Sequence, residues 1–351
     1  MKKIVSLICL TVLVISGCAR DYEILDSYDS VILTADRSYA LVNNIITFTV
    51  KDNNGNDHTG EASFYVNGEK ITGNALTSAT VKQYDVKAVL GPLSSETVKV
   101  SFGNTEELNF KKRVLIEDYT GTWCGYCTRV AWGLELVKAQ TDYAVPVAIH
   151  RPSSNPSNAQ YDPYNFDASA VENTLSAIGY PKGYLNRRTR WTSPEPNNVA
   201  QVINLTQGEN PKLGLAMTPK VENGNISLDV NVMFSKDFAA TNLKLVVYVL
   251  ENGLLYEQHN YTDYYNGQAV ITDWVHNHVL RSCLTDMLGD AIPAGETAAY
   301  NTYKRTFSIP VPENVTNTAN MEFVAFVLND ANRSVNVRNA HAGEVQQFEI
   351  E

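Results

Sequence analysis

Two cysteines three positions apart constrain the fold of this chain more than any other feature of its sequence. They are Cys124 and Cys127, in the run WCGYC at 123–127. The apolar run Val114–Ile116 precedes them, and apolar residues spaced as on one face of a helix follow as far as Val137. The pair therefore stands where a strand ends and a helix begins, which predicts an α/β segment around it.

This position favours redox chemistry. The unpaired amides at a helix N-terminus stabilise an anion, so a cysteine in the first turn of a helix loses its proton more readily. Cys124 is then a nucleophile, and Cys127 lies close enough to resolve a mixed disulfide. A purely structural disulfide and a zinc site are the alternatives, although we find no two further zinc ligands in the sequence.

The N-terminus indicates export. Lys2 and Lys3 precede the mostly apolar run Ile4–Ile15, and Cys18 follows small residues. This is a signal peptide whose end resembles a bacterial lipobox, so we expect cleavage before Cys18 and lipid on that cysteine. An ordinary signal peptide that happens to contain a cysteine is the alternative. Ala19 after the cysteine favours the outer membrane by resemblance to lipoprotein sorting rules, but it leaves open which face of that membrane the protein occupies.

Charge and cysteine content narrow the class of protein further. The formal net charge is −10 and no basic stripe is present, which argues against a nucleic-acid partner. After loss of Cys9 with the signal and lipidation of Cys18, only the close pair and Cys283 remain. An exported protein held together by disulfides carries several spaced pairs. We therefore expect the Cys124–Cys127 pair to have a chemical task.

The hydrophobic pattern divides the rest of the chain. After the signal peptide (1–17) and a linker (18–29), short β-type runs fill residues 30–104 and predict an immunoglobulin-like β-sandwich. Strands and helices alternate over 113–207. β-type runs return over 211–351 and predict a second, larger β-sandwich. The expected fold is therefore multidomain, with an α/β domain flanked by two β-sandwiches.

The expected elements follow from these runs. In the first segment we expect strands at 31–34, 46–50, 62–66, 86–90 and 97–100. In the middle segment we expect strands at 114–116, 143–149 and 184–185, and helices at 124–138, 166–178 and 197–205. In the last segment we expect strands at 213–221, 226–234, 243–250, 269–284, 303–311, 322–328 and 335–337.

Residues 114–127, VLIEDYTGTWCGYC, resemble the strand, loop and active-site helix of the thioredoxin superfamily. The Gly-Tyr dipeptide between the cysteines is similar to that of periplasmic disulfide isomerases. The lipobox, the Glu-Asp-Tyr-Thr-Gly run at 117–121 and a C-terminal β-domain together resemble the outer-membrane lipoprotein family related to the twenty-eight-kilodalton outer-membrane antigen of Bacteroidetes. The first resemblance implies a thioredoxin-like domain over 113–207 and a Cys124–Cys127 disulfide.

The thioredoxin resemblance also implies a substrate surface. Pro181 fits the cis-proline that lies against the disulfide, with an ordinary turn proline as the alternative. The backbone of Tyr180 would pair with a substrate strand. Trp123 would shield the disulfide and, with Tyr126, shape the docking surface, whereas core packing is the other interpretation of Trp123.

A carboxylate before the cysteines matches the buried proton acceptor of that superfamily. Asp118 and Glu117 are the candidates, and only one of them fits, because successive strand residues point to opposite faces. We favour Asp118; a solvated carboxylate is the alternative.

Four further features are interpreted structurally. His150 ends the second expected strand of the middle segment, and a hydrogen-bonded structural histidine is favoured over a proton shuttle. The irregular stretch 151–164 is expected to form a lip over the site. Cys283 is expected to be a buried, inert thiol. His276 and His278 can share a strand face, but no further ligand pattern completes a metal site.

Two functions from different classes follow. The first is a membrane-anchored thiol-disulfide oxidoreductase or isomerase that acts on the thiols or disulfides of exported proteins, with an unidentified redox partner and no organic cofactor. The second is a surface binding protein or adhesin of the outer membrane, in which the thioredoxin-like domain is a redox-inert scaffold. An apolar groove around Trp123 and Pro181 favours the enzyme. A covered cysteine pair, together with an apolar or aromatic patch, favours the binding protein.

Overall fold

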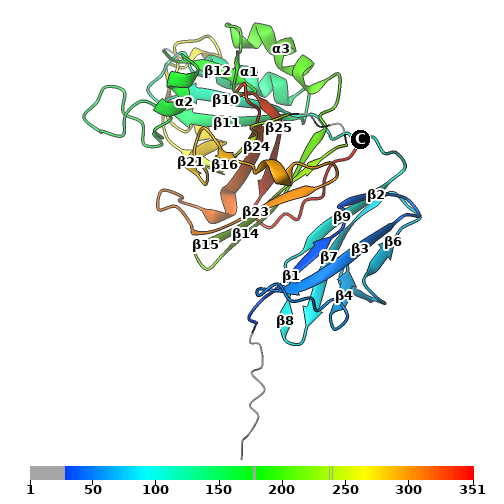
Figure 1. Ribbon diagram of the computed structural model, residues 1–351. Coiled ribbons are helices and arrows are strands. Elements are labelled where there is room, and N and C mark those ends of the chain that lie inside the picture. Colours follow the sequence, from blue (N-terminus) through cyan, green and yellow to red (C-terminus); the bar gives the residue numbers. More distant parts are fainter. Residues whose placement is uncertain (1–27, 177–178, 237, 239) are drawn as a thin grey trace, which may run out of the picture.

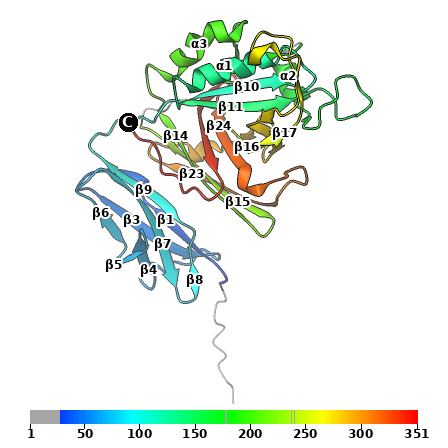
Figure 2. The same ribbon diagram turned by 180° about the vertical axis from the view of Figure 1, so that it is seen from behind.

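The computed structural model describes residues 28–176, 179–236, 238 and 240–351. The expected signal peptide and the lipidated Cys18 therefore lie outside the described residues. The protein is multidomain and mostly β, with few helices. A small N-terminal β unit lies to one side of a larger body that contains the rest of the chain (Figure 1, and from behind Figure 2).

The N-terminal unit consists of two sheets over one core. The first has the order β1-β3-β6, and the second has the order β2-β9-β7-β4-β5 with β8 paired to β7. Buried side chains of both sheets meet in this core, among them Phe48 from β3 and Val86 from β7. The strands are β1 Val31–Ala35, β2 Tyr39–Leu41, β3 Ile45–Asp52, β4 Ser63–Val66, β5 Glu69–Ile71, β6 Ala75–Thr77, β7 Lys82–Leu90, β8 Leu93–Ser94 and β9 Val98–Gly103.

The middle segment begins with the strand that carries the acidic pair. This strand, β10, runs parallel to β11 and antiparallel to β12. Its alternate residues face two different cores, one under the helices α1 and α3 and one toward the C-terminal strands. The elements are β10 Val114–Thr120, α1 Thr128–Lys138, β11 Ala144–His150, α2 Ser169–Thr174, β12 Lys182–Leu185, β13 Thr189–Arg190, η1 Glu195–Asn198, α3 Val199–Ile203 and η2 Asn204–Thr206.

The C-terminal segment supplies the remaining strands. They are β14 Leu213–Glu222, β15 Asn225–Phe234, β16 Lys244–Glu251, β17 Leu254–Leu255, β18 Gln258–His259, β19 Val270–Ile271, β20 Val275–His276, β21 Val279–Cys283, β22 Asp290–Ala291, β23 Thr302–Pro310, β24 Met321–Leu328 and β25 Ser334–His341. Short turns of 3-10 helix, η3 Tyr265–Gly267, η4 Ala294–Glu296 and η5 Thr318–Asn320, connect some of them. The run 269–284, expected as a single strand, contains three separate strands, β19 to β21.

Strands expected in two different domains share one sheet. Its order is β13-β12-β10-β11-β21-β16-β24-β25, with β22 paired to β16. The junction is the parallel contact of Ala148 in β11 with Val279 in β21. The three-stranded sheet β14-β15-β23 packs against β16 and β24 over a common core, so a sandwich does form here. One of its layers, however, continues into the middle segment, and the expected boundary at 207–211 does not separate the sheets.

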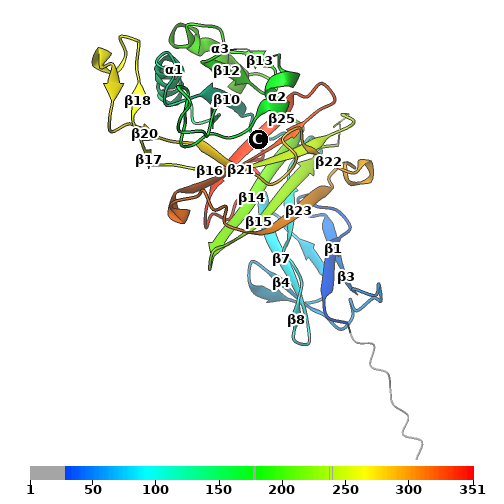
Figure 3. The same cartoon turned by 90° about the vertical axis from the view of Figure 1, so that its left-hand side faces the viewer.

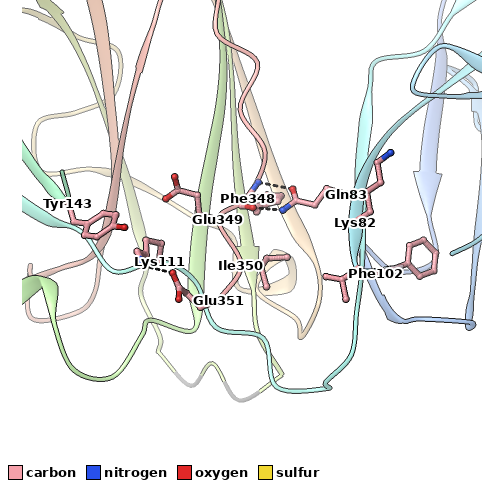
Figure 4. Close-up of a pocket in the computed structure, with 10 residues that line it drawn as sticks. Lys82, Gln83, Phe102, Lys111, Tyr143, Phe348, Glu349, Ile350 and Glu351 are labelled. Carbon is pink, nitrogen blue, oxygen red and sulfur yellow. Dashed lines mark hydrogen bonds and ion pairs between the residues drawn. The ribbon is translucent and has the colours of Figure 1, made fainter. Parts of the chain in front are cut away.

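The N-terminal unit contacts the body through the end of the chain. The backbone N–H of Phe348 donates to Gln83 Oε1 at 2.7 Å, and the amide nitrogen of Gln83 donates back to the Phe348 carbonyl. Beside this contact Lys111 forms an ion pair with Glu351 at 2.6 Å (Figure 4). The C-terminal residues therefore link the N-terminal unit to the body.

Candidate functional site

The two cysteines of the WCGYC run are joined in a disulfide with an S–S distance of 2.03 Å. They lie in the turns between β10 and α1, and both are buried: Cys124 is 5% exposed and Cys127 is 2% exposed. Very little of either residue therefore faces solvent.

The helix after the disulfide begins later than the sequence predicts. We expected it to start at Cys124, but α1 starts at Thr128 and Cys127 is its N-cap residue. The Cys127 N–H donates to the Cys124 carbonyl at 3.0 Å, which is a tight turn of the i to i+3 kind. Cys124 therefore lies outside the first turn of α1, and the helix dipole acts on it less directly than expected.

A long hairpin covers the disulfide turn. It comprises residues 252–278 between β16 and β21, and we call it the strap; Figure 3 shows it beside α1. The backbone N–H of His259 donates to the Thr122 carbonyl at 2.9 Å, and that of Tyr261 donates to the Gly125 carbonyl at 2.8 Å. The Gln258 amide nitrogen donates to the Cys124 carbonyl at 3.2 Å. The strap is thus hydrogen-bonded to the first part of the disulfide turn, at Thr122, Cys124 and Gly125.

Aromatic contacts hold the strap against α1. The ring of Trp132 in α1 stacks on Tyr264 with centroids 5.7 Å apart and meets Tyr265 edge-on at 5.5 Å. The hydroxyl of Tyr265 donates to Glu135 at 2.8 Å. Sequence reasoning missed this segment, since its pairing with a turn more than a hundred residues earlier follows no local periodicity. The available signal was the turn-rich run 260–267 inside a region of β pattern.

Two of the expected substrate residues, Trp123 and Tyr180, contact each other. The Tyr180–Pro181 peptide bond is cis. The Trp123 ring meets the Tyr180 ring edge-on at 5.8 Å, and its indole N–H donates to the Arg151 carbonyl at 2.7 Å. Burial first, and then its hydrogen bond to Glu172, raise the pKa of Tyr180 to about 12. The structure therefore brings Trp123 and Tyr180 together.

Tyr126 projects away from this group. It is 55% exposed and forms an edge-on pair with Tyr261 of the strap, which is 62% exposed, with centroids 5.6 Å apart. The two rings form an exposed aromatic surface at the junction of the strap and the disulfide turn.

The two acidic candidates point to opposite faces of β10. Glu117 is fully buried against Arg187, whose Nη2 lies 2.7 Å from its carboxylate, and the Tyr248 hydroxyl donates to it at 3.0 Å. This ion pair lies on the face of β10 away from the cavity that Asp118 and Cys127 line, so Glu117, the less favoured of the two candidates, is not positioned to take a proton from Cys127. Glu117 has a structural role.

Asp118 faces the cavity that Cys127 also lines. It is 4% exposed, and within the described part of the chain its Oδ1 has no hydrogen-bond partner. Burial, and then the charge of Glu195, hold the pKa of Asp118 well above its usual range. A raised pKa of this kind suits a group that exchanges a proton.

His150 is held by hydrogen bonds next to the same turn. Its Nδ1 lies 2.9 Å from Asp162 Oδ2, and that oxygen also accepts the Thr122 N–H at 2.8 Å. Burial alone would raise the pKa of Asp162. The nearby His150 and the hydrogen bonds from the backbone N–H groups of Thr122 and Tyr164 outweigh burial and lower the pKa below its usual value. The stretch 151–164 thus connects to the disulfide turn through Asp162, and the Tyr164 hydroxyl donates to the Leu255 carbonyl of the strap at 3.1 Å.

The remaining candidates are one cysteine and two histidines of the C-terminal segment. Cys283, in β21, is a free thiol whose pKa is raised by burial. His278 Nδ1 lies 2.7 Å from the carboxylate of Glu322, while His276 is a buried residue of the strap itself. Within the part of the chain that the structure describes, no group of three or more His, Cys, Asp or Glu side chains could hold a metal ion.

Residues 168–346, about half of the chain, match the family model described as Outer membrane protein Omp28. The chain belongs to the Omp28 family. Membership confirms the location expected from the sequence, the outer membrane of the cell envelope. Among the described residues, no helix has the length and apolar character needed to cross a membrane. The lipid on Cys18 remains a prediction.

Solved structures resemble this Omp28 family member at low identity. HBP35 of Porphyromonas gingivalis superposes with a TM-score of 0.50 at 18% identity, covering 68% of this chain and 79% of that one. This likeness concerns the fold alone. A domain of the outer membrane lipoprotein Omp28 from the same organism gives a TM-score of 0.26 at 16% identity, covering 39% of this chain and 92% of that one, and supports no structural argument. None of the curated proteins compared with the chain matches it.

The family match does not extend to the disulfide. It begins at residue 168, after β10, the WCGYC turn and α1. Omp28 membership therefore supports the outer-membrane part of the sequence analysis, whereas the thioredoxin-like domain stays a hypothesis.

Proposed function

We propose that this Omp28 family protein is an outer-membrane binding protein in which the disulfide is a structural part of the scaffold. The observation that carries the proposal is the cover over the disulfide. Cys124 and Cys127 are buried, and the strap is hydrogen-bonded to Thr122, Cys124 and Gly125. Very little of either cysteine is therefore open to a partner thiol.

The surface above the disulfide is suited to a partner. Four large apolar side chains are exposed on the strap and the adjoining turn, at 67% for Leu255, 62% for Tyr261, 55% for Tyr126 and 48% for Val275. Exposed aromatic and apolar groups of this kind mark interaction sites, and tyrosine is enriched at protein interfaces. Lipid on Cys18 would keep the surface close to the membrane.

The disulfide itself provides the first test. The chain from residue 18 with Cys18→Ser is equilibrated in graded glutathione buffers, and free thiols are counted by alkylation, with Cys124→Ser as the control. A scaffold disulfide is expected to stay oxidised, with a potential below roughly −300 mV. A midpoint within the window of roughly −270 to −120 mV, typical of exchange-active CxxC proteins, contradicts the scaffold proposal.

The partner surface provides the second test. A photo-crosslinking residue replaces Tyr261 on the strap, and the same residue replaces Ile32, which is 55% exposed in the N-terminal unit, as the matched control. In living cells the strap position is expected to give a discrete crosslinked product that the control position does not give. Equal products, or none from either position, argue against binding at the strap.

A thiol-disulfide oxidoreductase is the second candidate function. Asp118, whose Oδ1 accepts no hydrogen bond from the described residues, lines the same cavity as Cys127, and Trp123 contacts Tyr180 beside cis-Pro181. This arrangement favours a thioredoxin-like domain. In the reduced protein, the Cys124 thiolate attacks a disulfide of an exported protein and expels one thiolate. Cys127 then gives its proton to the Asp118 carboxylate, and its thiolate attacks the Cys124 sulfur of the mixed disulfide and releases the second thiolate. A thiol donor must restore the reduced pair.

A further inference from the structure

A cavity of about 400 Å³ lies beneath the strap. Its walls come from α1, from one face of β10 and β11, and from the strap residues 274–278. Cavities of roughly 300–1,000 Å³ hold small-molecule ligands in proteins. The cavity is therefore large enough for a compact organic molecule.

Two buried polar atoms in this cavity lack partners. Asp118 Oδ1 and His276 Nε2 form no hydrogen bond with any residue that the structure describes, although their own residues are only 4% and 5% exposed. Leaving such groups unpaired costs about 1–3 kcal/mol each, so native structures rarely do so. A ligand that donates hydrogen bonds to both atoms would remove this cost.

Both atoms act as hydrogen-bond acceptors, so a ligand must donate hydrogen bonds to them. The His276 ring already bonds to the backbone of Tyr256, so its Nε2 is the free lone pair of a neutral imidazole. Burial, and then the nearby His150, lower the pKa of His276 to about 3, so it stays neutral at physiological pH. Asp118 accepts hydrogen bonds through Oδ1 and gains an ion pair if a cation allows it to ionise.

The charges around the cavity favour a cation. Carboxyl groups line it from α1, the α1–β11 turn and β10, and Lys138 is the lysine in its lining; the carboxyl group from β24 is already paired with His278. The four acidic residues are Asp118, Glu135, Asp142 and Glu322. The walls also offer apolar contacts from Ile116 and Leu134 and the ring of Trp274, whose face attracts cations.

We propose that this cavity binds a small organic amine, with its ammonium group on Asp118, a second N–H or O–H on His276 and an apolar body against α1 and Trp274. This site deepens the proposed function, because it supplies a ligand class for the binding protein. Water is the alternative occupant, and an anionic ligand is disfavoured by the carboxylates.

Three matched indoles test the charge requirement. Tryptamine is a cation, tryptophol is its neutral counterpart and indole-3-acetate is an anion, and all three share one ring system. Each is titrated calorimetrically into the oxidised chain from residue 18 with Cys18→Ser. Tryptamine is expected to bind about tenfold or more tightly than tryptophol, a difference of about 1.4 kcal/mol. Indole-3-acetate is expected to bind most weakly.

Two variants locate the site. Asp118→Asn keeps the side-chain shape but not the charge, and is expected to abolish the preference for tryptamine over tryptophol. His276→Leu is expected to weaken both ligands alike. Asp57→Asn, on the exposed surface of the N-terminal unit, is the matched control and should change neither affinity. Thermal melts establish that every variant is folded before its titration is interpreted.

The outcomes separate this inference from the proposed function. The amine-binding inference is overturned if tryptamine and two further amines, phenethylamine and cadaverine, all fail to bind. It is also overturned if indole-3-acetate binds best, or if Asp118→Asn keeps the preference for tryptamine over tryptophol. An inert disulfide with no amine binding retains the scaffold function and rejects the site. Amine binding together with an exchange-active disulfide retains the site and rejects the scaffold function.

Discussion

Tyr261 of the strap lies directly against Gly125 of the disulfide turn. Its backbone N–H donates to the Gly125 carbonyl at 2.8 Å, and a Cβ at position 125 would lie 2.4 Å from the tyrosine ring. Glycine at this position is therefore required by the close approach of the strap. The size of the residue at position 125, between the two cysteines, therefore determines whether the strap can pack over them.

The variant Gly125→Ala is expected to displace Tyr261. Overpacking of this kind costs about 1–3 kcal/mol, and the loosened strap should expose the disulfide. We expect a lower melting temperature and faster reduction by dithiothreitol, measured by thermal unfolding and thiol counting. Gly60→Ala is the control, because no heavy atom lies within 4 Å of its added Cβ. Unchanged reduction in Gly125→Ala would show that the strap does not limit access to the sulfur atoms.

Removal of one partner of the buried pair Glu117–Arg187 should be severe. Arg187→Met leaves the Glu117 carboxylate without its cation in a fully buried position. The expected loss is about 3–5 kcal/mol of unfolding free energy in urea titrations. The double variant with Glu117→Gln should recover part of that loss, since no uncompensated charge remains. Additive losses in the double variant would contradict coupling between the two residues.

Stability should fall in acid partly through His276. Its pKa is about 3 in the folded protein, below the value of 6.5 for an unperturbed histidine. Between these values the unfolded chain binds the extra proton, so the unfolding free energy decreases as pH falls from about 6.5 towards 3. The maximal slope is about 1.4 kcal/mol per pH unit. His276→Leu should flatten this part of the pH profile, whereas His259→Leu, elsewhere in the strap, should leave it steep.

Membrane attachment is expected to depend on Cys18. A full-length chain with Cys18→Ser lacks the thiol that would carry lipid, so the protein should leave the membrane fraction when cells are lysed and fractionated. Cys283→Ser serves as the control, because that thiol lies in β21 of the folded body. Continued membrane association of the Cys18→Ser variant would point to an attachment other than lipid.

Local patterns predicted the elements far better than their pairing. The alternation of strand residues implied that Glu117 and Asp118 face opposite sides, and the structure places them so. The contact of Ala148 with Val279 joins segments that the hydrophobic pattern separated, because pairing between distant strands leaves no periodic signal in either one. The start of α1 was misplaced because a tight turn and a helical turn contain the same residue types.

The sequence predicted only part of the candidate site. Cys124, Cys127, Trp123 and Tyr180 could be named from one motif and its resemblance. The strap could not, because Gln258 and Tyr261 act through backbone and amide hydrogen bonds that many residue types provide. The cavity forms because the strap, which is distant in the sequence, brings His276 close to β10. It could therefore be identified only from the three-dimensional structure.

The shared sheet has a consequence for how the protein matures in the envelope. An exported chain emerges from its N-terminus, so β11 leaves the translocation channel long before β21, the strand that pairs with its outer edge at Ala148. During that interval the edge of β11 is unpaired and open to other strands. Pairing over such sequence distances is slow. We therefore expect folding of this protein after export to depend on periplasmic chaperones that shield the edge of β11 until the last third of the chain arrives.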